Sequence, residues 1–353
     1  MEQDSKKKLW IFIACAYGVV VLMSIFMYIG LRKSYDLNLF ITAQMMYPAC
    51  GVILGKMITR KKDEKLPMGA FITTLVVTAL MMIIALLSVF AHLEPVAIPG
   101  SEQTLDVYPN VMNIILMIGS IVAYALYWQC GKDVRKAHGL AHNNVKLSAV
   151  FIALFVVLYI GRLFIASMVY EFGEGPAVWI RDAIGAAGTS TGITGILLLP
   201  INYFLVFLPF FGEEYGWRYY LQPIMQKKFG NRLGVILLGI VWGLWHWDAD
   251  FMFYTKESGL VMQVNQIITC IVIAIFFGYV MMKTNNIWAC VIMHYLNNNL
   301  IPIFAGSADV ISNQSAKWGQ IPGALAAGLI FAVFIFAPIY SKKKEEIPLL
   351  AEA

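Results

Sequence analysis

Long apolar stretches recur along the whole sequence, and each is close to or above the roughly 20 residues that a helix needs to cross a bilayer. The chain has 353 residues, of which 59% are hydrophobic and only 13% charged, a composition that excludes a water-soluble globule. The sequence therefore predicts an all-α fold, a polytopic transmembrane helical bundle with about ten spans. The predicted spans are 9–31, 37–58, 67–92, 109–130, 147–170, 190–217, 233–251, 263–283, 286–306 and 321–340.

The basic residues support this division of the chain because they gather in alternate loops. With the N-terminal lysines in the cytoplasm, 20 of the 26 Lys and Arg residues fall on that side of the membrane. The asymmetry follows the positive-inside rule and predicts that both termini are cytoplasmic. The formal net charge of +5 is explained by this topology, so we infer the lipid bilayer as a partner and no nucleic acid.

The connecting loops are short and no internal repeat stands out, which favours one membrane domain. Gly239 and Gly243 have the small-xxx-small spacing that permits close contact between neighbouring helices. Short loops and a C-terminal "AEA" without a retrieval signal favour an integral, multi-pass protein of a prokaryotic plasma membrane.

The stretch "FFGEEYGWRYYLQP", residues 210–223, places ionisable groups at the end of a long apolar run. A charge in hydrocarbon costs at least ~2.5–3.5 kcal/mol, so such groups tend to face protein or water and to have a function. On a regular helix Glu214 and Arg218 share one face, which predicts an ion pair. Glu213 is rotated by about 100° from Glu214 and needs a different partner. Pro209 predicts a bend beside the two carboxylates.

Two of the five histidines lie deep in predicted spans. His246 stands in "VWGLWHWDAD" and His294 in "VIMHYLNNN", where Asn298 shares the helical face of His294. Their distances from the helix ends predict that both histidines lie near the level of the glutamates. Three predicted helices thus carry polar residues to one layer of the membrane, which indicates a functional site more than simple packing. These residues are Glu213, His246, and the pair His294 and Asn298.

Other polar groups near span ends have plainer interpretations. His92, His138 and His142 fall in loops or at span ends, where we expect them to be solvated. Asp248 and Asp250 lie near the outer end of the seventh span, and we expect them to be solvated helix-end residues as well. The alternative is that Asp250 orients the histidine ring of the same span.

Three motifs resemble those of a known family. "EEYGWR" matches E-E-x-x-x-R, "WGLWH" is similar to F-x-x-x-H, and "HYLNN" matches H-x-x-x-N of the CPBP family. This family, also called the Abi family, comprises intramembrane proteases related to the CAAX prenyl endopeptidase. The motifs occur in the family's order over residues 213–298, about a quarter of the chain. Trp242 stands where the family usually has Phe, so we expect a reshaped pocket wall and unchanged chemistry.

The resemblance implies a domain organisation as well. The family core has eight helices with its motifs on the fourth, fifth and seventh, and here the motifs fall on predicted spans six, seven and nine. We therefore expect two additional N-terminal transmembrane helices over 1–66, a CPBP-like protease core over 67–341 and a cytoplasmic tail over 342–353.

Hydrolysis of a peptide bond needs an activated water, a proton donor for the leaving amine and donors for the oxyanion. Glu213 is the predicted general base, because a carboxylate desolvated by an apolar bundle accepts a proton from water more readily. His246 would hold the same water and shuttle the proton. The resemblance assigns the oxyanion to His294 and Asn298, whose donor groups suit that role.

The remaining motif residues, Glu214, Arg218 and Trp242, are expected to support the site. Glu214 with Arg218 would fix the helix and the local field. The resemblance implies a peptide or lipidated protein as substrate, either a CAAX-type prenylated protein or a secreted-peptide precursor. The sequence carries no signature of an oligomeric state.

A zinc site is the alternative on the same residues. Glu213, His246 and His294 form a set of catalytic zinc ligands, and the family is often described as metalloproteases. However, no H-E-x-x-H pair lies on one helix, and Asn298 is a poor zinc ligand but a good oxyanion donor. We therefore favour a metal-free glutamate mechanism without a cofactor.

Two further functions compete with proteolysis. Polar groups near the midplane and proline-interrupted helices also mark transporters, where Glu and His relay protons. A proton-coupled transporter would, however, be expected to show a repeat between the chain halves, and none is visible. A non-proteolytic scaffold or immunity protein of the same family is the other alternative, and the intact catalytic motifs argue against it.

Overall fold

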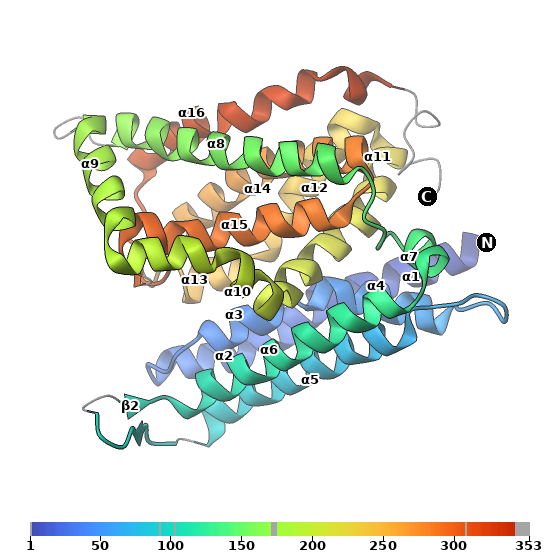
Figure 1. The fold of residues 1–353 in the computed structure, drawn as a ribbon, viewed down its shortest axis with the longest axis horizontal. Coiled ribbons are helices and arrows are strands. Elements are labelled where there is room, and N and C mark those ends of the chain that lie inside the picture. The colour runs from blue at the N-terminus through green and yellow to red at the C-terminus, as the bar shows by residue number, and fades with distance from the viewer. Residues whose placement is uncertain (1, 92, 102–103, 171–174, 308, 343–353) are drawn as a thin grey trace. The chain divides into compact units, whose positions relative to one another are not determined.

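The computed structural model describes the chain apart from residues 1, 92, 102–103, 171–174, 308 and 343–353. The described residues are almost entirely helical, which confirms the predicted all-α class (Figure 1). The chain divides into two compact units. Unit 1 comprises Met1–Leu140 and Asn202–Gly216, and unit 2 comprises Ala141–Ile201 and Trp217–Ala353. The domain boundaries expected at residues 66 and 341 stay predictions, and the expected tail lies outside the described residues apart from Lys342.

Unit 1 is built from helices with short connections and one hairpin. Its helices are α1 (Glu2–Ile13), the π-helix Ala14–Gly18, α2 (Val19–Arg32), α3 (Asn38–Gln44), α4 (Tyr47–Ile58), α5 (Met68–Phe90), α6 (Val107–Gln129) and α7 (Lys132–Ala137). Strands β1 (Val96–Ala97) and β2 (Thr104–Leu105) pair in antiparallel fashion between α5 and α6.

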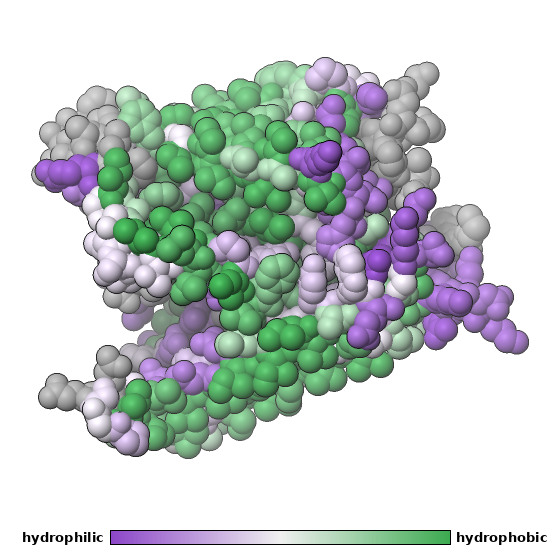
Figure 2. Space-filling model, viewed as in Figure 1, coloured by the Kyte–Doolittle hydropathy of each residue, from purple (hydrophilic) through white to green (hydrophobic). Residues whose placement is uncertain are grey.

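Helices α5 and α6 lie side by side in unit 1 (Figure 1). Gly119 permits the close approach, because a Cβ at this position would lie only 2.3 Å from Val77 Cγ2. Hydrophobic side chains cover the outer surface of the pair, and hydrophilic residues gather at the end that carries the 59–65 loop (Figure 2). Exposed apolar faces of this extent are expected where lipid is the solvent.

The second half of α10 (Ser190–Glu214) belongs to unit 1 and is bent. The backbone of Val206 leaves helical geometry, with φ −135° and ψ 23°. Pro209 follows three residues later, and a proline ring clashes with the carbonyl one turn before it. A bend close to Pro209 is therefore present, but it lies at Val206, seven residues before Glu213, and not directly beside the carboxylates.

Two glycines bring the end of α10 close to the start of α4. A Cβ on Gly212 would lie 2.3 Å from the carbonyl oxygen of Met45, and one on Gly216 would lie 2.2 Å from Pro48 Cβ. Larger residues at either position would push this backbone outward. The glycines thus fix the segment that carries both glutamates inside unit 1.

Unit 2 contains most of the remaining helices. They are α8 (Val145–Tyr170), α9 (Gly175–Gly188), the first part of α10, the π-helix Tyr215–Leu221 from Trp217 onward, α11 (Gln222–Phe229), α12 (Asn231–Trp245), α13 (Trp247–Met252), α14 (Gly259–Thr284), α15 (Ile287–Ala305) and α16 (Ile321–Ala332). Short 3₁₀ turns cover Asp309–Ile311, Trp318–Gln320, Val333–Phe336 and Pro338–Ser341. Helix α14 packs against α12 and α16, and α8 packs against α15 and α16 (Figure 1).

The position of α12 is set by glycines at its start and along one face. Gly230 has φ +85°, a conformation that favours glycine, and it turns the chain from α11 into α12. A Cβ at Gly239 would lie 2.4 Å from Ile271 Cα, and one at Gly243 would lie 2.6 Å from Ile267 Cα. The close helix contact that this spacing predicted is therefore made with α14.

Eight helices of the described residues are long and apolar enough to cross a membrane. They are Gln3–Arg32, Asn38–Ile58, Met68–Phe90, Val107–Gln129, Val145–Met168, Ser190–Phe229, Gly259–Thr284 and Trp318–Phe336. These helices correspond to eight of the ten predicted spans, and the protein is an integral, multi-pass membrane protein. The orientation of the termini stays a prediction.

The other two predicted spans differ for identifiable reasons. Helix α12 has only 15 residues, because His246 leaves helical geometry with φ −83° and ψ 7° and α13 follows as a separate short helix. Helix α15 has 19 residues, but one histidine and three consecutive asparagines lower its hydropathy. Both helices carry predicted site residues, and these polar residues weaken the span signal.

Candidate active site

Unit 2 brings two predicted site helices together around one indole. Helix α12 supplies Trp242 and His246, and α15 supplies His294. The Trp242 ring centroid lies 5.7 Å from that of His294 and 6.1 Å from that of His246. Both histidines are buried, with exposed fractions of 9% and 6%. The two imidazoles therefore lie on one aromatic cluster and are nearly shielded from solvent.

The ring of His246 is oriented by its own helix. Its Nδ1 lies 2.9 Å from the carbonyl oxygen of Trp242, and Trp245 packs edge-on against the ring at 4.9 Å. His246 is the C-cap of α12, where the last carbonyls of a helix lack intrahelical partners. A carbonyl accepts only from a protonated nitrogen, so Nδ1 carries the hydrogen and Nε2 keeps a lone pair in the neutral ring. The imidazole is thus presented as a base through Nε2.

Arg218 is fully buried and stacks on aromatic rings. Its guanidinium carbon lies 4.5 Å from the Trp242 ring centroid and 5.4 Å from that of Phe277. Such stacking is favourable and is strengthened by desolvation. Trp242 therefore contacts a cation and both histidines, which gives the indole at the family's phenylalanine position a definite structural role.

The backbone around Arg218 departs from regular helix. Residues Tyr215–Leu221 form a π-helix directly after Glu214. The expected pairing of Glu214 with Arg218 assumed α-helical spacing, and that pairing stays a prediction. Short π-helical insertions occur frequently at functional sites.

Asn298 lies on α15, half-buried, one turn after His294. Its side-chain oxygen accepts a hydrogen bond from the Asn297 amide at 2.9 Å, while Asn299 donates to the Tyr295 carbonyl at 2.9 Å. Because the oxygen of Asn298 accepts this hydrogen bond, the NH₂ group of the side chain is left to act as a donor. This orientation suits the stabilisation of negative charge.

Both glutamates of the first motif are buried in unit 1. The exposed fraction is 1% for Glu213 and 0% for Glu214. Tyr215 follows them, stacks on Phe211 with a centroid distance of 4.9 Å and donates to the His138 carbonyl at 3.1 Å. The carboxylates belong to a different unit from the histidines, so their meeting stays a prediction.

Several residues expected to be solvated are buried. Asp248 and Asp250 have exposed fractions of 2% and 0%, and His138 one of 3%. His142 is half-buried and stacks on Trp288 with a centroid distance of 5.3 Å. His92 lies outside the described residues. The position of a residue near a span end marks where hydrocarbon stops, but it does not reveal which neighbouring segment covers that residue.

The expectation for Asp250 as an orienting partner is not met. The Trp242 carbonyl holds His246 Nδ1, and within the described residues neither carboxylate oxygen of Asp250 has a hydrogen-bond partner. The backbone N–H of Asp250 donates to the His246 carbonyl at 2.8 Å. Asp250 is therefore tied to the site through its main chain.

Two contributions to the site were missed in the sequence. The carbonyl of Trp242 orients His246, and the side chain of Asn297 orients Asn298. The first had a signal, because a histidine that ends a helix can reach the unpaired carbonyl four residues before it. The second had none, since neighbouring residues on a helix do not normally face each other.

His138 lies outside the membrane spans and is held in a basic environment. Its Nε2 lies 2.8 Å from the Lys65 carbonyl oxygen, and its Nδ1 lies 3.2 Å from Lys56 Nζ. Burial, and then the positive charge of Lys56, lower the pKa of His138 below its ordinary value. Both effects favour the neutral form of the imidazole.

Metal coordination requires three donors that converge on one point. Within either unit, no three His, Cys, Asp or Glu side chains of the described residues are arranged to hold a metal ion. The zinc set considered above takes Glu213 from unit 1 and both histidines from unit 2. The metal-free mechanism stays a prediction.

The fold and these side chains define a multi-pass membrane protein with buried carboxyl and imidazole groups on several helices. Residues 195–300 match the family model described as type II CAAX prenyl endopeptidase Rce1-like. The matched segment contains all three motifs, which confirms the resemblance to the CAAX protease family and supports a CAAX-type endopeptidase. No curated protein and no solved structure matches the chain.

Proposed function

We propose that the protein is an intramembrane endopeptidase that hydrolyses a peptide bond of a membrane-associated substrate, either a CAAX-type prenylated protein or a secreted-peptide precursor. The observation that carries the proposal is the orientation of His246. Its Nδ1 is occupied by the Trp242 carbonyl, so that Nε2 is available as a base within the segment that matches the protease family. The burial of Glu213 in an apolar bundle supports its role as a second base.

In the proposed reaction, Glu213 and His246 Nε2 hold one water molecule. Glu213 removes a proton from this water as its oxygen attacks the carbonyl carbon of the scissile bond. The carbonyl π bond opens, and the oxygen takes up the electron pair as an oxyanion. His294 and the Asn298 amide donate hydrogen bonds to this oxyanion. The proton then passes to the leaving amine as the carbon–nitrogen bond breaks.

The supporting residues act on the geometry of this site. Arg218 over the Trp242 ring fixes the indole, and the indole in turn packs against both imidazoles. Replacing a group that merely positions others lowers the rate less than removing the base itself. We propose this positioning role for Arg218, with Glu214 acting on the same helix.

The first test uses purified protein and a panel of prenylated and unprenylated membrane-tethered peptides. Glu213→Gln and His246→Ala should each lower the cleavage rate by about 100-fold or more. Glu257→Gln, an exposed residue of unit 2, and His142→Gln serve as matched controls and should cleave like the wild type. Wild-type cleavage by either site variant would overturn the assignment.

A second test separates the mechanisms and functions that share these residues. Activity that survives chelation supports the metal-free glutamate mechanism, whereas activity lost to a chelator and restored by zinc would replace it with a metalloprotease. Vesicles containing the protein should show no proton-coupled solute flux. Flux that Glu213→Gln abolishes, without cleavage of any peptide, would assign the protein to transporters.

A further inference from the structure

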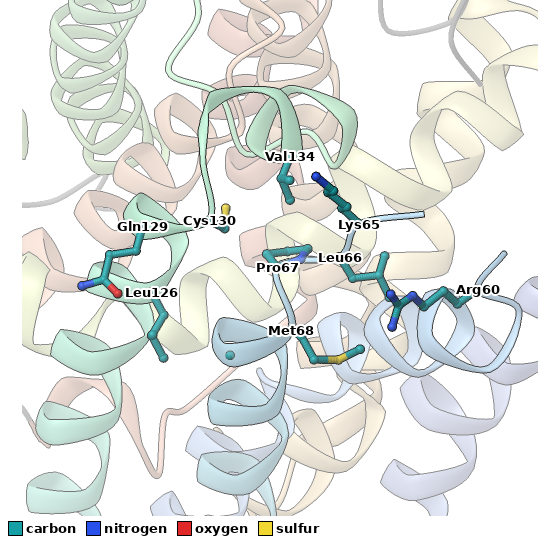
Figure 3. Close-up of a pocket in the computed structure, with 10 residues that line it drawn as sticks. Arg60, Lys65, Leu66, Pro67, Met68, Leu126, Gln129, Cys130 and Val134 are labelled. Atoms are coloured by element: carbon teal, nitrogen blue, oxygen red, sulfur yellow. The ribbon is translucent and has the colours of Figure 1, made fainter. Parts of the chain in front are cut away.

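Unit 1 contains a pocket that the proposed reaction does not use. It has a volume of about 420 Å³ and lies where α6 ends and α5 begins, beside the 59–65 loop and α7 (Figure 3). Sites for small ligands commonly have volumes of this size. Arg60 and Lys65 extend from one side of the pocket and Leu126 lies on the opposite side (Figure 3). Leu66 and Val134 add further apolar lining.

The charge of this region is strongly positive. The 56–65 segment has five basic and two acidic residues, and α7 has three basic and one acidic. The acidic Glu64 is directed at its own loop, since its carboxylate accepts from the Lys61 backbone N–H at 3.3 Å. Within the described residues the ammonium group of Lys65 makes no hydrogen bond or ion pair, so its charge remains available for an anion.

The guanidinium of Arg60 is held in place by a hydrogen bond that uses only one of its N–H donors. Its Nε donates to the Glu64 carbonyl oxygen at 2.9 Å, which fixes the guanidinium beside the pocket. Arginine has five N–H donors, and the terminal ones suit the two oxygens of a phosphate. The pocket therefore offers an anionic group two cations, the guanidinium of Arg60, which is held in place, and the ammonium of Lys65 on its flexible side chain.

An exposed tryptophan marks the level of this pocket in the bilayer. Trp128 is 58% exposed at the end of α6, and the guanidinium carbon of Arg135 lies 4.6 Å from its ring centroid. Arg135 also donates to the Trp128 carbonyl. Tryptophan and arginine in such a pair are typical of the boundary between hydrocarbon and headgroups. The pocket adjoins this pair and so lies at headgroup level.

Apolar stripes run from the pocket along both helices. On α5, Ile72 and Val76 continue the face that begins at Gly69 and are 47% and 50% exposed. On α6, Val122 and Ile118 continue the face of Leu126 and are 41% and 59% exposed. A molecule with its anionic end in the pocket could lay its hydrocarbon chains along these stripes.

From these observations we infer that the pocket binds the phosphate headgroup of an anionic phospholipid, whose acyl chains follow α5 and α6. Basic pockets between membrane helices are known to bind anionic headgroups. A free phosphate ion would satisfy the two cations but would leave the apolar stripes unused. The inference is independent of the proposed peptidase activity, because none of the residues that line the pocket takes part in the proposed reaction.

The test measures lipid binding to the full-length protein in neutral detergent by native mass spectrometry. Phosphatidylglycerol, phosphatidylcholine with the same acyl chains, and inorganic phosphate are compared. At roughly 1 kcal/mol per basic residue and 1.4 kcal/mol per tenfold change, Arg60→Gln with Lys65→Gln should weaken phosphatidylglycerol binding by about 25-fold. Lys62→Gln, in the same loop but outside the pocket, should change the affinity by less than about 5-fold.

Cys130 supplies a second readout that does not depend on a variant folding well. This thiol lines the pocket and is partly exposed, so phosphatidylglycerol should slow its modification by a maleimide while phosphatidylcholine should not. Equal affinity for the two lipids, unchanged binding by the double variant, or unprotected Cys130 would each overturn the inference. Full displacement of the lipid by inorganic phosphate would instead assign a phosphate site, and the lipid assignment would be wrong.

Discussion

The contact between α12 and α14 gives a sharp test of how the histidine is positioned. We expect Gly239→Ala to destabilise the protein and to slow cleavage. The added Cβ would lie 2.4 Å from Ile271 Cα. Carbon atoms pack at about 3.5–4.0 Å, so the two helices must separate by roughly 1.1–1.6 Å at this level.

The size of both effects follows from that displacement. The obstacle is backbone, so no side-chain rotation relieves it, and overpacking of this kind costs ~1–3 kcal/mol. The higher helix propensity of alanine returns up to ~1 kcal/mol, which leaves a net loss of up to about 2 kcal/mol. His246 caps the same helix, and a misplacement of about 1 Å can slow an enzyme by about 100-fold.

Thermal unfolding of the purified protein in detergent measures the first effect, and single-turnover cleavage of a tethered peptide measures the second. Gly18→Ala is the matched control, because a Cβ there meets nothing within 4 Å and its φ of −62° is helical. If Gly239→Ala melts no lower than Gly18→Ala, the close α12–α14 contact is refuted. If the variant melts lower but cleaves at the wild-type rate, the position of α12 does not limit the chemistry.

Three further results are expected. Lowering the pH from about 7.5 to 5 should destabilise the wild type more than His138→Gln, as followed by thermal melting. Burial and then Lys56 lower the pKa of His138 in the folded protein. The stability that this residue contributes is therefore fully present above the unfolded pKa of about 6.5 and is lost as the pH falls through the folded pKa. Equal losses would contradict the buried neutral imidazole. Asn298→Ala should lower kcat by about 100-fold with little change in KM, and Asn297→Ala by a smaller factor, in steady-state cleavage assays; a change in KM alone would argue against oxyanion binding. Asp250→Asn should raise the melting temperature, because it replaces a buried carboxylate whose oxygens have no hydrogen-bond partner in the described part of the chain; a lower melting temperature would mean that the carboxylate is needed for packing.

Much of the membrane architecture could be predicted because its signals are local. Apolar runs of sufficient length predicted eight helices that the structure contains, Pro209 predicted the bend at Val206, and the spacing of Gly239 and Gly243 predicted a close helix contact. Each of these signals acts through the chain's own backbone or one helix face. Such effects can be recognised without knowledge of the partner.

The site was harder to predict because its details depend on neighbours. Asp248 and His138 were expected in water but are buried. His138 contacts Lys56 and the Lys65 carbonyl, which are remote from it in sequence. The partner of His246 was missed because a backbone carbonyl leaves no mark in the residue types. The types of residue that meet at Trp242 could be predicted from the sequence, whereas the orientations of their side chains could not.

The π-helix over Tyr215–Leu221 has a consequence for comparing this chain with others. Each turn of such a segment takes in more residues than a regular turn, because its hydrogen bonds reach five positions along the chain instead of four. Deleting one residue there would let the segment return to a regular helix while the side chains beyond it keep roughly the faces they now present, because the wider π-helical turn had accommodated the extra residue. A protein with the same motif letters on a regular helix would aim its arginine elsewhere, so the spacing of the motif has to be compared together with the type of helix that carries it.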